Sequence, residues 1–214
     1  MDELTDTDRR VARIDEPAPV FEARSTRGFV RLEDYRGRWL VLFSHPANFT
    51  PVCTTEFLAF QAAMPKFEAR HCDLLGLSVD SLYAHIAWVK DIEDRLGVRI
   101  EFPILEDISM SVAQAYGMIH AGSESTAAVR SVFVIDPDGM LRAQIHYPMN
   151  VGRSVAEILR LVSALQDSEA RQCVMPEGWQ PGEPGFLPPP LDQTGALDGA
   201  EEDEVWYMRR EVLS

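Results

Sequence analysis

The chain has 214 residues, 46% hydrophobic and 25% charged, as in a globular protein that buries a full core. Its formal net charge of −14 excludes the basic surface that nucleic-acid binding requires, and anionic membranes would repel it. The N-terminal segment has no signal-peptide pattern and no apolar run is long enough to span a membrane. Three cysteines do not make a disulfide framework, so we expect a cytoplasmic protein.

Changes in composition divide the chain into three expected regions. Residues 1–16 are polar and predict a flexible N-terminal lead-in, and residues 17–168 alternate strand-like and helix-like segments. Residues 169–214 are expected to form an extended C-terminal arm or small C-terminal domain, because prolines between 175 and 191 favour an extended backbone. The arm continues through an acidic stretch at 192–204 to bulky apolar residues at 205–208. We expect these to pack on the same domain or on a partner subunit.

The strand-like segments are continuous apolar runs, which are typical of strands buried on both faces. They lie at 39–43, 74–79 and 131–135, and the turn residues at 136–139 predict a hairpin to a further strand at 140–147. Apolar residues at helical spacing predict helices over 51–69, 84–96 and 155–166. This order of elements predicts an α/β sandwich with a thioredoxin-like fold.

The loop between the strand at 39–43 and the helix at 51–69 carries the main chemical signal. Thr50 suits the N-cap and Pro51 the first helical position, so Cys53 falls in the first turn of the helix. Unpaired backbone N–H groups and the helix dipole favour a thiolate there, and the thiolate is the nucleophilic form of cysteine. An inert core cysteine is disfavoured at this place, and no metal is expected because no cysteine or histidine has ligand spacing from Cys53.

The same loop resembles the active-site motif of the peroxiredoxins, in which proline, threonine and cysteine have the spacing of Pro46, Thr50 and Cys53. The longer string from His45 to Glu56 resembles the one-cysteine subfamily of peroxiredoxins. Similar stretches continue along the chain, so the resemblance covers nearly all of it. They lie at 84–88, 101–104, 116–118, 130–137, 147–148, 152–153, 157–160 and 179–182.

The resemblance implies that Cys53 attacks a peroxide, becomes a sulfenic acid and releases water or an alcohol. The Thr50 hydroxyl, the Cys53 amide and the Arg130 guanidinium would stabilise the charge that develops on the departing oxygen. Pro46 would shield the thiolate from water. The resemblance implies peroxide as the substrate and no cofactor.

Three further residues match supporting positions of the family, and each has a structural alternative. His45 would lie beside the cysteine, but a histidine after a strand is also a common structural residue. Glu56 would orient the arginines, or serve only as a partner of the helix dipole. Arg153 would be a second active-site arginine, or a surface charge near a helix start. Asn48 stands where many relatives carry aspartate, so we expect different hydrogen bonding within the loop.

The other cysteines bear on how a sulfenic acid would be reduced. In a familiar subset of the subfamily a resolving cysteine ends an aromatic string in the C-terminal arm, and here Arg209 stands at that position after Met208. Cys72 precedes a buried strand and is interpreted as structural, which leaves Cys173 as the remaining candidate for a resolving cysteine. We expect a one-cysteine cycle completed by an external thiol of the thioredoxin, glutaredoxin or small-thiol type.

Two other classes of function compete with this interpretation. A thioredoxin-type disulfide oxidoreductase needs a second cysteine where Glu56 stands, and glutamate forms no disulfide. A non-enzymatic binding or chaperone-like oligomer stays open on the sequence, and peroxide-dependent oxidation of Cys53 would distinguish it. The resemblance also implies a homodimer in which the proline-rich arm reaches the other subunit, with a decamer as the larger assembly.

Overall fold

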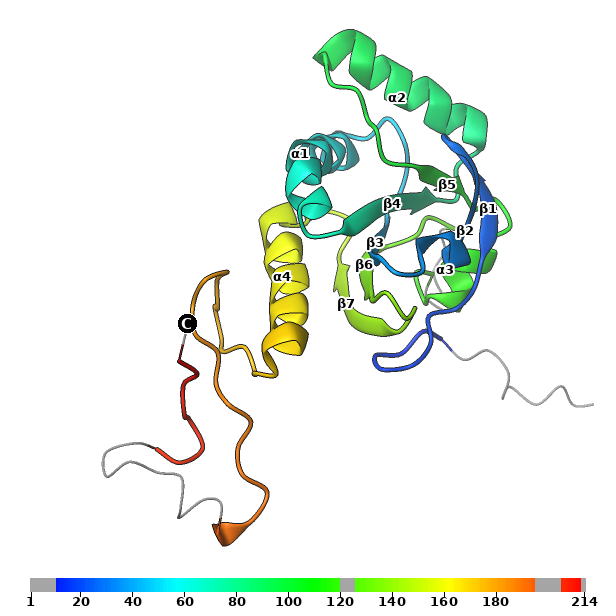
Figure 1. Ribbon diagram of the computed structural model, residues 1–214. Helices are drawn as coiled ribbons and strands as arrows, with labels where there is room; N and C mark the ends of the chain where they lie inside the picture. Colours follow the sequence, from blue (N-terminus) through cyan, green and yellow to red (C-terminus); the bar gives the residue numbers. More distant parts are fainter. Residues whose placement is uncertain (1–10, 120–125, 195–204, 213–214) are drawn as a thin grey trace, which may run out of the picture. The chain divides into compact units, whose positions relative to one another are not determined.

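Figure 1 shows the computed structural model of the chain, which describes residues 11–119, 126–194 and 205–212. The chain divides into two compact units, Met1–Val155 and Ala156–Ser214. Within the predicted lead-in, residues 1–10 lie outside the described residues, and so do residues 195–204 of the acidic stretch. Among the helices that are described, none is both long and apolar enough to cross a membrane.

The first unit contains one mixed sheet of seven strands with helices between them. Its elements in chain order are β1 (Glu22–Ser25), β2 (Gly28–Arg31), the 3-10 helix η1 (Leu32–Tyr35), β3 (Trp39–Ser44), α1 (Pro51–Glu68), β4 (Cys72–Ser78), α2 (Leu82–Leu96), β5 (Ile104–Glu106), α3 (Ser111–Ala115), β6 (Arg130–Ile135) and β7 (Leu141–Tyr147). The last helix, α4 (Val155–Arg171), begins at the boundary of the two units. All the predicted strands and helices are present, so the predicted elements are confirmed.

The strand order across the sheet is β2-β1-β5-β4-β3-β6-β7. β3, β4 and β5 run parallel to one another, whereas β6 pairs antiparallel with both β3 and β7. The crossovers from β3 to β4 and from β4 to β5 contain α1 and α2, as parallel neighbours require. This arrangement confirms the predicted α/β, thioredoxin-like fold.

Alternate residues of β3 point to opposite faces of the sheet, and each face has its own core. Leu42 belongs to the cluster of buried residues that includes Val112 of α3. On the opposite face the Phe43 ring stacks on Phe60 of α1, with ring centroids 4.1 Å apart. A Cβ at Gly76 of β4 would lie 3.5 Å from the Phe43 ring, so the glycine leaves room for this aromatic layer. The aromatic layer fixes α1 on the sheet.

The junction between β3 and α1 determines where Cys53 lies. β3 is buried along its whole length and ends at Ser44. The loop then turns through Phe49, whose φ of 55° is in the left-handed region, and Thr50 is the N-cap of α1 in extended conformation. Cys53 is therefore the third residue of a helix that begins beyond the carboxyl end of a central parallel strand, where α/β sheets usually place their functional sites.

The second unit is α4 followed by extended chain. Short antiparallel bridges join Val174 to Phe186 and Phe186 to Arg210, so the C-terminal segment pairs with the proline-rich segment. The buried Trp179 indole donates to the Glu183 carbonyl. Residues 205–208 of this chain remain between 43% and 56% exposed.

Candidate active site

Cys53 is fully buried, and its Sγ lies 3.2 Å from Nη1 of Arg130. As the third residue of α1 it carries one of the backbone N–H groups that have no partner inside the helix. The Thr50 side chain makes no capping bond, and its hydroxyl donates to the Ala47 carbonyl at 3.0 Å. Among the described residues no acceptor is found for the Cys53 amide, so both the amide and the helix dipole favour negative charge at the sulfur.

Arg130 is the first residue of β6 and only 3% exposed. Because β6 runs antiparallel to β3, its first residue lies beside the end of β3 and the start of α1. One nitrogen, Nη1, donates both to Cys53 Sγ and to Glu56 Oε2, the latter at 2.7 Å. Nε donates to the Met149 carbonyl at 3.0 Å, which fixes the plane of the guanidinium. The structure therefore brings the predicted Arg130 and Cys53 together.

Glu56 lies three residues after Cys53 on the same face of α1 and joins the two arginines. Its Oε1 accepts from the Arg153 backbone N–H and from Nε, both at 2.8 Å, and its Oε2 accepts from Arg153 Nη2 at 2.9 Å. Burial acts to raise the pKa of Glu56, but the hydrogen bonds and charge of Arg153, with the charge of Arg130, hold that pKa below its usual value. Glu56 is therefore an anion at neutral pH.

Arg153 connects Glu56 to the sheet through hydrogen bonds. Its Nη1 donates to the carbonyls of Ser44 and Ser131, each at 2.8 Å, and so links the end of β3 to the start of β6. Its guanidinium carbon lies 5.3 Å from the centre of the Phe43 ring. Arg153 and Arg130 bring two positive charges against the one negative charge of Glu56, and a thiolate at Cys53 would balance the remaining charge.

Sequence reasoning missed several groups that shape this site. The carbonyls of Met149, Ser44 and Ser131 hold the two arginines, but a backbone acceptor leaves no side-chain signal in a sequence. Gly152 lies against α1, where a Cβ would be 3.3 Å from Val52 Cγ1. This close approach lets the loop before Arg153 reach Glu56.

His45 and Pro46 are both buried directly after β3. The His45 Nε2 lies 2.9 Å from Asn48 Oδ1, and its ring packs on Phe57 with centroids 4.9 Å apart. No hydrogen bond joins His45 to Cys53 among the described residues. His45 is therefore part of the loop that carries Cys53 without touching the sulfur through a hydrogen bond, and the shielding role of Pro46 stays a prediction.

The remaining cysteines are buried and free. Cys173 lies in the second unit, where its thiol donates to Glu211 Oε2 at 2.9 Å.

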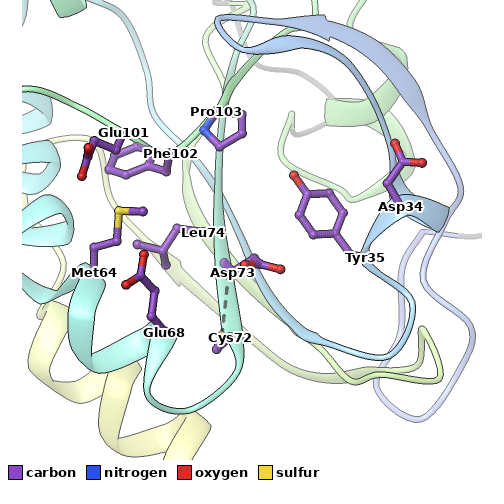
Figure 2. A pocket seen from close by; sticks show the side chains of 10 residues that line it. All are labelled: Asp34, Tyr35, Met64, Glu68, Cys72, Asp73, Leu74, Glu101, Phe102 and Pro103. Atoms are coloured by element: carbon purple, nitrogen blue, oxygen red, sulfur yellow. Dashed lines mark hydrogen bonds between the residues drawn. The ribbon is translucent and has the colours of Figure 1, made fainter.

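Cys72 lies at the start of β4 and lines a pocket of about 240 Å³ with Tyr35, Glu68 and Phe102 (Figure 2). Burial, with the charge of Asp73, raises the pKa of Cys72 to about 12, so this thiol stays protonated. These contacts agree with a structural interpretation of Cys72.

The pocket and Cys53 lie at opposite ends of α1. Cys53 is in the first turn of the helix and Glu68 is its last residue. Fifteen residues of helix separate them by about 22 Å, since each residue adds about 1.5 Å. The pocket in Figure 2 is thus separate from the site around Cys53.

Comparison with known proteins places the chain in a family. The model of the AhpC/TSA family matches residues 14–144, and that of the C-terminal domain of 1-Cys peroxiredoxin matches residues 164–202. A peroxiredoxin 2 of Caldanaerobacter subterraneus subsp. tengcongensis is 50% identical over 83% of this chain and 80% of its own. A peroxiredoxin of Aquifex aeolicus is 46% identical over 92% of this chain and 95% of its own.

Solved structures agree with this placement. A yeast mitochondrial 1-Cys peroxiredoxin has a TM-score of 0.83 at 38% identity, covering 94% of this chain and 99% of that one. A cysteine-to-serine mutant of peroxiredoxin 6 from Arenicola marina has a TM-score of 0.81 at 33% identity, covering 92% of this chain and 96% of that one. With its two family matches and these relatives, the chain belongs to the peroxiredoxins, which are thiol-dependent peroxidases, and within them to the one-cysteine subfamily.

Proposed function

We propose that the chain reduces hydrogen peroxide and organic hydroperoxides through Cys53 as the peroxidatic nucleophile. The observation that carries this proposal is the 3.2 Å contact between Arg130 Nη1 and Cys53 Sγ at the uncapped first turn of α1. A cation, a helix N-terminus and burial act on the same sulfur. The first two favour the thiolate and burial keeps bulk water away from it.

The proposed first step is a displacement at oxygen. The Cys53 thiolate attacks one peroxide oxygen, an S–O bond forms and the O–O bond breaks. The sulfur keeps an OH group as a sulfenic acid, and the other oxygen leaves as hydroxide or alkoxide and takes up a proton to give water or an alcohol. The sulfur loses two electrons and the peroxide gains them, so no cofactor is needed.

Three donors are available for the charge that develops on the leaving oxygen. Arg130 is already at the sulfur, and the Cys53 amide has no acceptor among the described residues. The Thr50 hydroxyl belongs to the same turn, and it currently donates to the Ala47 carbonyl. That bond is within the loop, so the hydroxyl can exchange it for a bond to peroxide. Glu56 and Arg153 act through Arg130 as positioning residues.

The proposed second step is reduction by an external thiol. A first thiol attacks the sulfur of the sulfenic acid and forms a mixed disulfide with Cys53. The OH group leaves with the proton of that thiol as water. A second thiol then releases the Cys53 thiol and leaves as the external disulfide. The Cys173 thiol is buried and bonded to Glu211, which supports a donor from outside the chain. The yeast relative is described as resolved through glutathione and thioredoxin systems, and we extend a reductant of that class to this chain.

The proposal includes a cytoplasmic enzyme that works as a homodimer, with a decamer as the larger assembly. Three free cysteines suit a reducing compartment. Apolar residues of the arm remain exposed in the single chain, Leu191 and Val212 almost completely. Such surface is typical of a segment that packs on another subunit.

Stopped-flow measurement of peroxide consumption tests the proposed function. We expect wild type to consume one peroxide per chain in a fast phase that Cys53→Ser abolishes. Cys72→Ser is the matched control, because it removes an equally buried cysteine whose thiol stays protonated, and it should keep the fast phase. A wild-type rate no faster than that of a free cysteine would contradict the proposal.

A further inference from the structure

A buried hydrogen-bonded chain links the Cys53 loop to α2 and β5. Asn48 lies in the loop between His45 and Cys53, and His85 lies in the second turn of α2. His45 Nε2 is 2.9 Å from Asn48 Oδ1, Asn48 Nδ2 is 3.0 Å from His85 Nδ1, and His85 Nε2 is 3.1 Å from the Leu105 carbonyl. Both histidines are fully buried and Asn48 is 9% exposed.

When both imidazole rings are neutral, the last acceptor fixes the direction of every bond in this chain. The Leu105 carbonyl can only accept, so His85 Nε2 carries a proton, and in a neutral ring Nδ1 is then an acceptor. Both polar atoms of the Asn48 amide lie near His85 Nδ1, Nδ2 at 3.0 Å and Oδ1 at 3.2 Å. With Nδ1 an acceptor, the shorter contact is the hydrogen bond: Asn48 donates from Nδ2, and its Oδ1 accepts from Nε2–H of His45. His45 Nδ1 is left as a bare acceptor with no partner among the described residues. Each imidazole holds one proton, and the chain is neutral.

We propose that Asn48 is a positioning residue for the Cys53 loop, because its amide donates to one histidine and accepts from the other and so makes a link that is complete without any charge. A neutral link of this kind keeps its geometry through the pH range in which histidines usually titrate. The effect of this link on turnover rests on the proposed role of Cys53. The directions of the hydrogen bonds in the link do not depend on that role.

The charged groups around the two histidines act in opposite directions on their protonation. Asp80 has a carboxylate oxygen within 4.8 Å of a ring nitrogen of each histidine and favours a proton on both, but it already accepts from the Asn48 backbone N–H at 2.8 Å and from the Ser78 hydroxyl at 2.9 Å. Arg153 opposes a proton on His45, whereas Glu106 favours one on His85. Burial is the largest influence: it lowers the pKa of His45 to about 3 and holds the pKa of His85 below its usual value.

An aspartate at position 48 would change the nature of the link. A carboxylate accepts from His45 as the amide does, but it has no proton to give to His85 Nδ1. If His85 keeps its bond to the Leu105 carbonyl, it could donate to the carboxylate only as an imidazolium, with protons on both ring nitrogens. Asn48→Asp should therefore turn a link that is complete at every pH into one that is complete only when His85 is protonated.

Nitrogen NMR of the histidine rings in the full-length wild-type protein tests the neutral link directly. We expect His45 and His85 each to show one protonated Nε2 and one bare Nδ1, with no change between about pH 5 and pH 8. In Asn48→Asp we expect both ring nitrogens of His85 to be protonated in the lower part of that range. Protonation of either wild-type ring within that range, or an Nδ1–H tautomer, would overturn the proposal. The wild-type spectrum decides this even if the variant does not fold.

The positioning role is tested by the rate of Cys53 oxidation against pH. Above the titration of His85 we expect Asn48→Asp to react about tenfold more slowly than wild type, since small shifts of a reacting group have large effects on rate. Below that titration the ratio of the two rates should return toward one. If the ratio of the two oxidation rates does not change with pH, Asn48 has only a structural role and the proposed positioning role is overturned. Absence of any peroxide reaction in wild type would instead refute the proposed function and leave the NMR result standing.

Discussion

Arg130 is shared between the proposed nucleophile and a buried carboxylate, because one nitrogen contacts both Cys53 Sγ and Glu56 Oε2. The same guanidinium reaches the Met149 carbonyl through Nε. A forked, planar cation can make these bonds at once, whereas an ammonium group on a flexible stem cannot hold the same positions. We therefore expect the site to require arginine at this position and not merely a positive charge.

Replacing Arg130 with lysine should lower the rate of Cys53 oxidation by about 100-fold or more, as expected when one donor to a developing oxyanion is lost. Stopped-flow kinetics with hydrogen peroxide would measure this. Arg31→Lys is the matched control, because the Arg31 side chain is 58% exposed in a surface ion pair, and it should react like wild type. An Arg130→Lys rate close to that of wild type would refute the role given to the guanidinium.

Replacing Glu56 with glutamine should destabilise the fold, because it leaves two buried arginine charges without their carboxylate; breaking a buried pair costs about 3–5 kcal/mol. The folded-state pKa of Glu56 is lowered, so its stabilising contribution is present above the unfolded pKa and is lost as pH falls through the folded pKa. The difference in unfolding free energy between wild type and Glu56→Gln should thus be largest near neutral pH and shrink in acid.

Urea unfolding of both proteins at a series of pH values would measure this difference. Glu22→Gln, at an exposed carboxylate, should show no such dependence. A Glu56→Gln difference that stays constant or grows as pH falls would mean that the carboxylate does not serve as the buried anion of the site.

At the scale of elements, the N-terminus of α1 departs from the usual capping arrangement. Thr50 occupies the predicted N-cap, but its hydroxyl bonds to the Ala47 carbonyl and not to the first turn. Replacing a capping threonine usually costs about 1 kcal/mol of stability. Here the hydroxyl makes no capping bond, so we expect stability and activity to respond differently to its removal.

Thr50→Val should therefore reduce the peroxidase rate by about 100-fold, as for loss of one transition-state donor, while stability falls by less than about 1 kcal/mol. Thr50→Ser keeps the hydroxyl and should retain most of the rate. Chemical unfolding and stopped-flow kinetics on the same preparations would give both numbers. Equal loss of rate in the serine and valine variants would show that the hydroxyl is not a donor in the reaction.

The sequence predicted the elements whose apolar pattern is long and regular. The runs that became β3, β4, β6 and β7 and the periodic segments of α1, α2 and α4 were all found, and Gly97 ends α2 at a φ of 69° as a left-handed C-cap. The short hairpin of β1 and β2 gave no signal, because charged residues such as Arg24 and Arg31 alternate along exposed strands. α3 has only five residues, too few for a helical period.

The site was predictable only in part. The N-cap and proline signals at Thr50 and Pro51 placed Cys53 in the first helical turn, which is a local property. The pairing of Glu56 with Arg130 and Arg153 depends on chain segments 74 and 97 residues away, and backbone carbonyls complete it. Local sequence rules do not encode contacts of this range, so only the resemblance to a known family indicated them.

For the molecule as a whole, we propose that Cys53 of the first unit works without Cys173, whose buried thiol is bonded to Glu211 within the second unit. Cys173→Ser should therefore leave both the oxidation rate and turnover with an external thiol unchanged. Non-reducing electrophoresis of peroxide-treated wild type should show no Cys53–Cys173 disulfide. Loss of turnover in the variant together with that disulfide would replace the one-cysteine cycle by a two-cysteine cycle.

The exposed apolar residues of the arm lead to a prediction about assembly. Residues 205–208 and Leu191 are exposed in the single chain, and a partner subunit would cover them. Light scattering at micromolar concentration should give the mass of a dimer or of a larger ring of dimers. A monomer under these conditions would contradict the proposed packing of the arm on another subunit.

The most direct test is mass spectrometry after treatment with about one equivalent of hydrogen peroxide, with a reagent that traps sulfenic acids. The account predicts a trapped sulfenic acid on Cys53, with Cys72 and Cys173 unmodified. An unmodified Cys53, or first oxidation at either of the other two cysteines, would contradict it.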